Sequence, residues 1–243
     1  MGEKTVCIYC LKDSFSTKNL EHVIPEALGC KDTLPKGDVC DSCNNYFSIL
    51  DKNVLYNRYI SLHVGTEEVL GKKAKVRKQL GEKLSFPKKD EFIISLQGTI
   101  PQGKYQAGAE FDFKIEQSKE FDELLFARGI HKIAFNCYAY KFGQHEALQN
   151  RFNNLRQYVR YAKFDELWTY GVKVPNSARN RHMAELHDKN FGLFLGLPLL
   201  TLAFFVSLTG WRNEIESEVI KNGYCIISRK GQWTASSLLG LQE

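Results

Sequence analysis

Residues 7–44 read CIYCLKDSFSTKNLEHVIPEALGCKDTLPKGDVCDSCN, so this stretch begins and almost ends with a Cys-x-x-Cys pair. Each pair can present two thiolates on one tight turn, and two such turns complete a tetrahedral zinc site. The expected ligands are Cys7, Cys10, Cys40 and Cys43. Four protein ligands leave no open coordination position, which predicts a structural ion. A redox pair and chance burial are the alternatives.

The remaining cysteines and the N-terminal residues bear on the compartment in which the protein is expected to work. Cys30 has no partner at knuckle spacing, whereas Cys137 and Cys225 stand in apolar contexts and are expected to be core thiols. The N-terminus has no apolar segment typical of a secretory signal. We therefore expect a cytoplasmic protein, and in a reducing cytosol paired cysteines bind metal more often than they form disulfides.

Residues 1–60 are expected to form a small metal-bound module. Residues 6–10 and 20–24 are interpreted as short strands, the second ended by Pro25. A helix is expected to begin just after Cys43, because apolar residues then recur at helical spacing. These residues are Phe47, Leu50 and Val54.

Residues 61–90 form a connector that carries the basic excess of the chain. Between Gly71 and Lys89 there are eight basic residues against one acidic residue, whereas the whole chain has a net charge of +5. Such a run suits a phosphate backbone, but a solvated linker explains it equally well. The basic residues assigned to nucleic-acid binding are Lys72, Lys73, Lys75, Arg77 and Lys78.

Residues 91–243 are expected to form a larger α+β domain, which makes the whole chain α+β. Helices are expected over 119–141 and 145–162. Strands are expected over 92–100, 107–115, 167–174, 191–208 and 223–228. The role of this domain is open between recognition, sensing and dimerisation.

The uncharged stretch from Phe191 to Leu208 is close to the length of a membrane span. Gly192, Gly196 and Pro198 interrupt it, however, and favour two buried strands, or a strand and a helix, joined near residues 196–198. We therefore expect a buried core segment and no membrane association.

Between the cysteine pairs, Glu21 and His22 precede Pro25, and Asn44 follows the second pair. Histidine can deprotonate water near neutral pH, and carboxylate and amide oxygens suit Mg²⁺ or Mn²⁺. Taken singly, a histidine such as His22 is more often a packed or surface residue than a catalyst, Glu21 is uninformative, and Asn44 is a good helix N-cap.

In their order and spacing, Cys7-x-x-Cys10, residues 21–25 and Cys40-x-x-Cys43-Asn44 resemble the HNH endonucleases of the ββα-metal (His-Me) finger class. The resemblance implies that His22 is the general base and that Glu21 and Asn44 hold a catalytic divalent ion. It also implies cleavage of nucleic acid, with 5′-phosphate and 3′-hydroxyl products.

This chain differs from the pattern of the family in two ways. The family usually has a further asparagine behind the base, where this chain reads Leu34-Pro35-Lys36-Gly37-Asp38, so Asp38 is expected to shape the loop. The acid is Glu21 and not the commoner aspartate. In addition, adjacent residues on a strand face opposite sides, so Glu21 and His22 share a site only if the strand ends there.

The expected function is a metal-dependent endonuclease acting on double-stranded DNA in restriction or phage defence, with a homodimer left open. The alternatives are a non-catalytic zinc ribbon that binds nucleic acid through residues 71–89, and a nuclease that cuts RNA. A further nucleic-acid face, or the solvent side of a helix, is indicated by basic and aromatic residues. These are Arg151, Arg156, Arg160, Tyr158 and Tyr161.

Overall fold

The computed structural model describes residues 6–13, 16–58, 60–61, 64, 79–80, 84–88, 91–94, 118–163, 170–173, 185–189, 192–199, 202–209, 217, 220–221 and 225–226. The basic residues Lys72 to Lys78 and the strand expected over 107–115 lie outside these ranges. The described chain is a mixture of helix and antiparallel sheet, so the mixed fold class is confirmed.

The described helices are the 3₁₀-helix η1 (Glu26–Leu28), α1 (Asp41–Tyr56), α3 (Glu123–Phe142), α4 (Gln144–Ala147), the 3₁₀-helix η3 (Asn150–Phe152) and α5 (Asn153–Tyr161). The helices α1 and α3 lie close to the ranges expected from apolar spacing, whereas the range 145–162 is divided into α4, η3 and α5. Helix α1 begins before Cys43 and not after it, because Cys40 is the N-cap and its sulfur accepts a hydrogen bond from the amide of Cys43.

The strands form two antiparallel sheets. One sheet has the order β1 (Gln79–Leu80), β2 (Leu84–Lys88), β3 (Glu91–Ile94). The other has the order β5 (Glu185–Lys189), β6 (Gly192–Leu199), β7 (Leu202–Ser207), β4 (Tyr170–Lys173), β8 (Cys225–Ile226).

The apolar stretch near residue 200 forms two buried strands, as expected, but they join at a different place. Strand β6 runs through Gly196 and Pro198 without a break, and Leu199 pairs with Leu202 of β7. Pairing with β7 keeps β6 extended through Gly196 and Pro198, so neither residue ends the strand. Within the described ranges, no helix is long and apolar enough to cross a bilayer.

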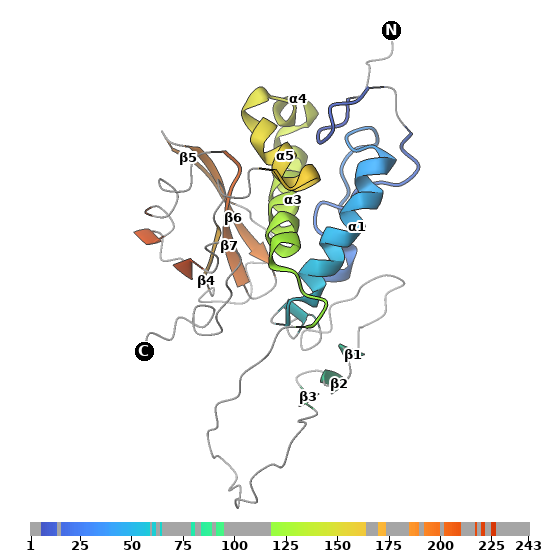
Figure 1. Cartoon of the computed structure of the whole chain (residues 1–243), viewed down its shortest axis with the longest axis vertical. Coiled ribbons are helices and arrows are strands. Elements are labelled where there is room, and N and C mark those ends of the chain that lie inside the picture. Colours follow the sequence, from blue (N-terminus) through green and yellow to red (C-terminus); the bar gives the residue numbers. More distant parts are fainter. Residues whose placement is uncertain are drawn as a thin grey trace, which may run out of the picture.

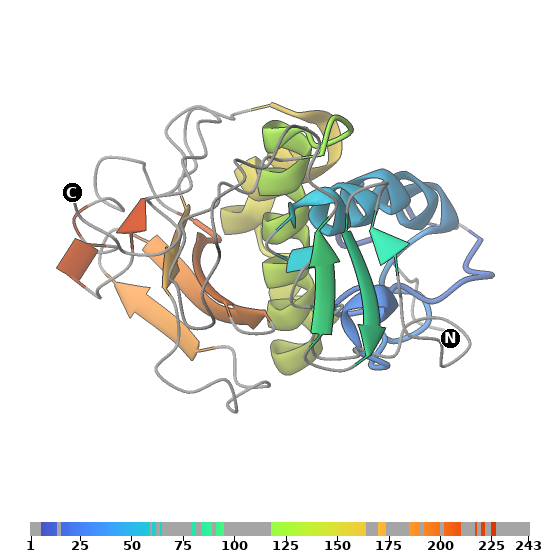
Figure 2. The same cartoon turned by 90° about the horizontal axis from the view of Figure 1, so that it is seen from below.

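Helix α3 lies between α1 on one side and the five-stranded sheet on the other (Figures 1 and 2). On the side of the sheet, Phe126 contacts Phe204 of β7 with ring centroids 6.1 Å apart. On the side of α1, Gly129 allows close approach of the two helices. One hydrophobic core therefore runs from Cys7 to Leu208 and joins the expected N-terminal module to residues beyond 118.

The two short strands expected in the module are not formed. Val6 makes a single bridge to Asp13, and His22 makes a single bridge to Thr33. The chain turns directly after Val6 because the cysteine pair requires a tight turn, and Leu11 takes a left-handed conformation there (φ 57°). The detailed ββα arrangement is therefore not confirmed.

Candidate metal centre and active site

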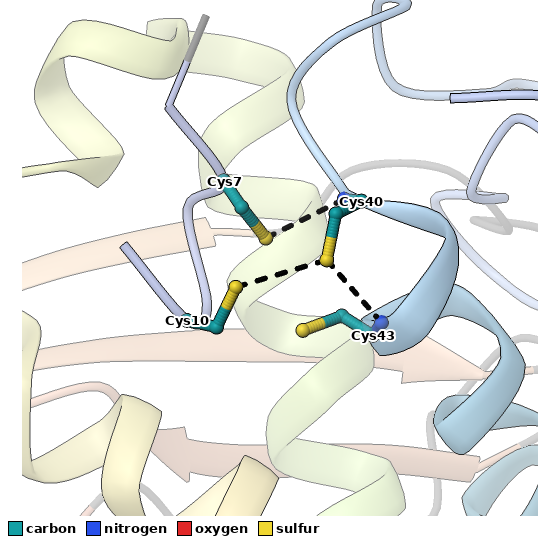
Figure 3. Close-up of side chains that lie close together, drawn as sticks. All are labelled: Cys7, Cys10, Cys40 and Cys43. Atoms are coloured by element: carbon teal, nitrogen blue, oxygen red, sulfur yellow. Dashed lines mark hydrogen bonds between the residues drawn. The ribbon is translucent and has the colours of Figure 1, made fainter. Parts of the chain in front are cut away.

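The four cysteines that were expected to bind zinc lie together (Figure 3). Their sulfur atoms all lie within 4.8 Å of one another, and the sulfurs of Cys10 and Cys40 are 3.7 Å apart. A tetrahedral ion with metal–sulfur bonds of about 2.3 Å separates its ligands by about 3.8 Å. The four cysteines are thus positioned to bind a metal, and they are not joined as disulfides.

Backbone amides stabilise the cluster from both turns. The amide of Cys40 donates to the sulfur of Cys7, and the amide of Cys43 donates to the sulfur of Cys40, each at 3.4 Å. In the first turn, the amide of Leu11 donates to the carbonyl of Cys7. The two bonds from amides to sulfur favour the thiolate form, which is the form that binds metal.

The thiols differ in their readiness to ionise. A hydrogen bond from Cys43 lowers the pKa of Cys7 to about 5, whereas burial raises the pKa of Cys10 to about 11. A bound cation favours deprotonation of all four thiols, because thiolates are the ligands.

Helix α5 supports the first cysteine turn through Arg156. This side chain is 1% exposed, and its Nε donates to the carbonyl of Ile8 at 2.7 Å. Arg156 and Tyr158 are both buried, so their expected place on a nucleic-acid or solvent face was wrong. Arg160 instead lies over the ring of Tyr46, 4.2 Å from its centroid.

The segment that contains His22 keeps the alternation of an extended chain. Glu21, Val23 and Pro25 are buried, whereas His22 and Ile24 are partly exposed. Backbone hydrogen bonds hold both of the buried residues that flank His22, because the Glu21 carbonyl accepts from Leu34 and the Val23 amide donates to Asp32. Glu21 and His22 therefore face opposite sides.

The His22 side chain is 33% exposed, and its Nε2 lies 3.9 Å from a carboxylate oxygen of Glu26. Its Nδ1 is buried and has no hydrogen-bond partner among the described residues. Glu26 follows Pro25 in the helical turn of η1, which returns its side chain toward His22. The four-residue spacing between His22 and Glu26 is the signal by which this pair could have been found in the sequence.

Glu21 points into the interior. It is 4% exposed, and its Oε1 forms an ion pair with Nζ of Lys132 and accepts a hydrogen bond from Asn136 at 3.1 Å. Burial raises the pKa of Glu21, and the neighbouring Lys132 cation acts in the opposite direction. Lys132 and Asn136, both on α3, were not anticipated, because a lysine or asparagine in a helix is usually solvent-exposed.

Asn44 lies in the first turn of α1 and is partly exposed. Its Nδ2 donates to the carbonyl of Asn19 at 3.2 Å. The loop that the family usually shapes with another asparagine is tied by backbone bonds of Asp38, whose amide donates to Pro35 and whose carbonyl accepts from Ile8.

The comparison with known families gives a match to part of the chain. Residues 7–54 match the HNH endonuclease family. The HNH segment contains both cysteine pairs, His22 and most of α1, and it ends before α3. No curated protein and no solved structure matches the chain.

Proposed function

We propose that this protein is an HNH endonuclease that hydrolyses phosphodiester bonds in double-stranded DNA, with His22 as the general base. The observation that carries the proposal is a partly exposed histidine, His22, inside the HNH segment that also contains the cluster of four cysteines. Restriction or phage defence is the setting we propose. Lys72, Lys73, Lys75, Arg77 and Lys78 are proposed to contact phosphates.

We propose that one particular nitrogen of His22 takes the proton. Because Nδ1 is buried, Nε2 is the atom that can take a proton from an attacking water. The Glu26 carboxylate, 3.9 Å from Nε2, would stabilise the imidazolium that results. Glu26 is thus proposed to assist the base.

For the cysteine cluster we propose a structural zinc ion. The sulfur separations fit a tetrahedral thiolate site, and four ligands leave no position for water or substrate. The ion would stabilise the turns at Cys7 and Cys40, and chemistry would take place at His22 instead.

The family resemblance also implies a catalytic Mg²⁺ or Mn²⁺ ion held by Glu21 and Asn44. Asn44 fits this role, because it is partly exposed at the start of α1. Glu21 does not fit as placed, because its carboxylate is buried on the side opposite His22 and is bonded to Lys132 and Asn136. Glu21 as placed is therefore not assigned as a ligand of this ion.

The test is cleavage of plasmid DNA with Mg²⁺ or Mn²⁺, comparing wild type with His22→Ala. Removing a general base typically lowers the rate by about 100- to 10,000-fold, so His22→Ala is expected to be inactive in this assay. His145→Ala is the matched control, since the side chain of His145 is 96% exposed and lies outside the HNH segment. Undiminished cutting by His22→Ala contradicts the mechanism.

Two further arms separate the alternatives. A structured RNA substrate tests whether the enzyme prefers RNA. A non-catalytic zinc ribbon would instead show salt-sensitive binding that is indifferent to His22 and to added Mg²⁺, with no cleavage in any condition.

A further inference from the structure

Asn136 of α3 is a fully buried amide in direct contact with the backbone of His22. Its Nδ2 donates to the His22 carbonyl at 2.9 Å and to Oε1 of Glu21 at 3.1 Å. Its Oδ1 accepts from the hydroxyl of Tyr9 at 2.6 Å. Both amide hydrogens therefore have partners, and the Tyr9 bond fixes which end of the amide faces His22.

Lys132, one helical turn before Asn136, fixes the other side of the same segment. Its ammonium group is fully buried and is shared between Glu21 and Asp51. The carboxylate of Glu21 thus receives two donors from α3. A buried polar network in which each member is satisfied is rigid, and it specifies one arrangement of the groups that it joins.

We propose that Asn136 and Lys132 are positioning residues for His22, and that Glu21 acts in the same network and not as a ligand of the catalytic ion. This inference rests on the nuclease function proposed above. The His22 backbone is anchored at its carbonyl by Asn136 and at the preceding side chain by Lys132. The imidazole, on the opposite face of the chain, takes its direction from this anchored backbone.

Asn136 and Lys132, which together anchor the backbone of His22, lie outside the HNH segment, because that segment ends at residue 54. Within the matched residues, the backbone bonds to Leu34 and Asp32 hold the chain on either side of His22, but the His22 carbonyl itself accepts from Asn136. Helix α3 therefore completes the geometry of the active site.

The first experiment compares Asn136→Ala with Asn53→Ala in the full-length chain. Asn53 is also a buried asparagine, 2% exposed, but its amide bonds the backbone of Asp122 at the other end of the interface between α1 and α3. We expect kcat to fall about 10- to 100-fold in Asn136→Ala, because small misplacements of a catalytic group have effects of this size. KM for DNA should stay within about twofold in both variants, and kcat should be unchanged in Asn53→Ala.

A milder variant covers the case in which Asn136→Ala does not fold. Tyr9→Phe removes only the hydroxyl that orients the Asn136 amide. Its kcat is expected to fall several-fold with full metal content and an unchanged KM. If a folded Asn136→Ala or Tyr9→Phe keeps the wild-type kcat, the positioning role is overturned while the nuclease function stands.

Glu21→Gln distinguishes positioning from metal binding. As a positioning residue, Glu21 affects kcat without changing the Mn²⁺ concentration that gives half-maximal activity. A ligand role would raise that concentration in Glu21→Gln, and this result would overturn the assignment of Glu21.

A spectroscopic arm does not depend on activity. Nitrogen-15 spectra of the histidine rings are recorded for wild type, Asn136→Ala, Tyr9→Phe and Asn53→Ala, and the His22 signals are assigned by their loss in His22→Ala. We expect the His22 signals to move in the first two variants and not in Asn53→Ala. If the wild-type protein fails to cut, the proposed function is wrong. If the His22 signals do not move in Asn136→Ala and Tyr9→Phe, the positioning role is wrong, whatever the result of the cleavage assay.

Discussion

The Nζ atom of Lys132 lies 2.9 Å from Oδ1 of Asp51, so a fully buried ammonium on α3 is paired with a carboxylate on α1. Burial acts to lower the pKa of Lys132, but the attraction of Asp51 and Glu21 outweighs it, and the pKa lies above its ordinary value. Lysine is rarely buried without such partners. Lys132 thus joins α3 to α1 through Asp51, and to the segment of His22 through Glu21.

Lys132→Met should therefore destabilise the protein strongly. The substitution leaves two carboxylates near an apolar side chain, and breaking a buried pair in this way costs about 3–5 kcal/mol. Chemical denaturation of wild type and variant measures the change. Lys141→Met, on an exposed position of the same helix, is the control and should change the free energy of unfolding by about 0.5 kcal/mol or less. Equal losses in the two variants would show that the network does not stabilise the fold.

Gly129→Ala should weaken the contact between α1 and α3. A Cβ atom at Gly129 would lie 2.6 Å from Cγ2 of Val54 and 3.1 Å from the carbonyl oxygen of Leu50. Overpacking costs about 1–3 kcal/mol, whereas the gain in helix propensity is about 1 kcal/mol, so we expect a net loss of about 1 kcal/mol. Thermal denaturation checks this, and the double variant Gly129→Ala with Val54→Ala should show favourable coupling between the two changes. Additive losses would mean that the Val54 methyl group is not the obstacle.

His131 should make the protein less stable in acid. It is fully buried, its Nδ1 bonds the carbonyl of Ala127 at 2.8 Å, and burial lowers its pKa from 6.5 to about 4. Between these values the unfolded chain binds a proton that the folded chain does not, so stability is full above about pH 6.5 and falls as the pH falls toward 4. The total loss is about 3 kcal/mol. His131→Gln should show a smaller difference in the free energy of unfolding between about pH 7 and about pH 4.5. An unchanged difference would assign the acid sensitivity to other groups.

Metal analysis should find about one zinc ion per chain, and Cys43→Ser should abolish it. Structural zinc contributes to folding directly, so chelation of the wild-type protein should also lower its melting temperature. Cys30→Ser is the matched control, because Cys30 lies outside the four-cysteine cluster and should leave zinc content unchanged. Full zinc in Cys43→Ser would contradict the ligand set.

The features that could be predicted from the sequence are those with a local signature. Cysteine spacing predicted the cluster, and apolar spacing predicted α1 and α3 within a few residues, whereas the single helix expected over 145–162 is divided into α4, η3 and α5. The strand expected at residues 6–10 failed for a local reason as well. Its β-branched residues favour extended chain, but the turn that brings Cys7 and Cys10 together takes precedence.

The anchoring of the site could not be predicted, because it depends on partners far apart in the sequence. Asn136 bonds Glu21 across 115 positions, and Arg156 bonds Ile8 across 148 positions. On their helices these residues resemble ordinary solvent-facing side chains. Only the three-dimensional arrangement shows that Lys132, Asn136 and Arg156 are buried against the HNH segment.

The hydrogen bond from Arg156 to Ile8 has a consequence for how the protein is made. The first cysteine turn leaves the ribosome early, whereas α5, which supports it, is synthesised 148 residues later. At about 5–20 residues per second, the nascent chain carries this turn for roughly 7–30 s before its support exists. Oxidation of Cys7 and Cys10 during that interval would remove two of the four sulfur ligands, so we expect the yield of folded protein to be sensitive to oxidants during synthesis.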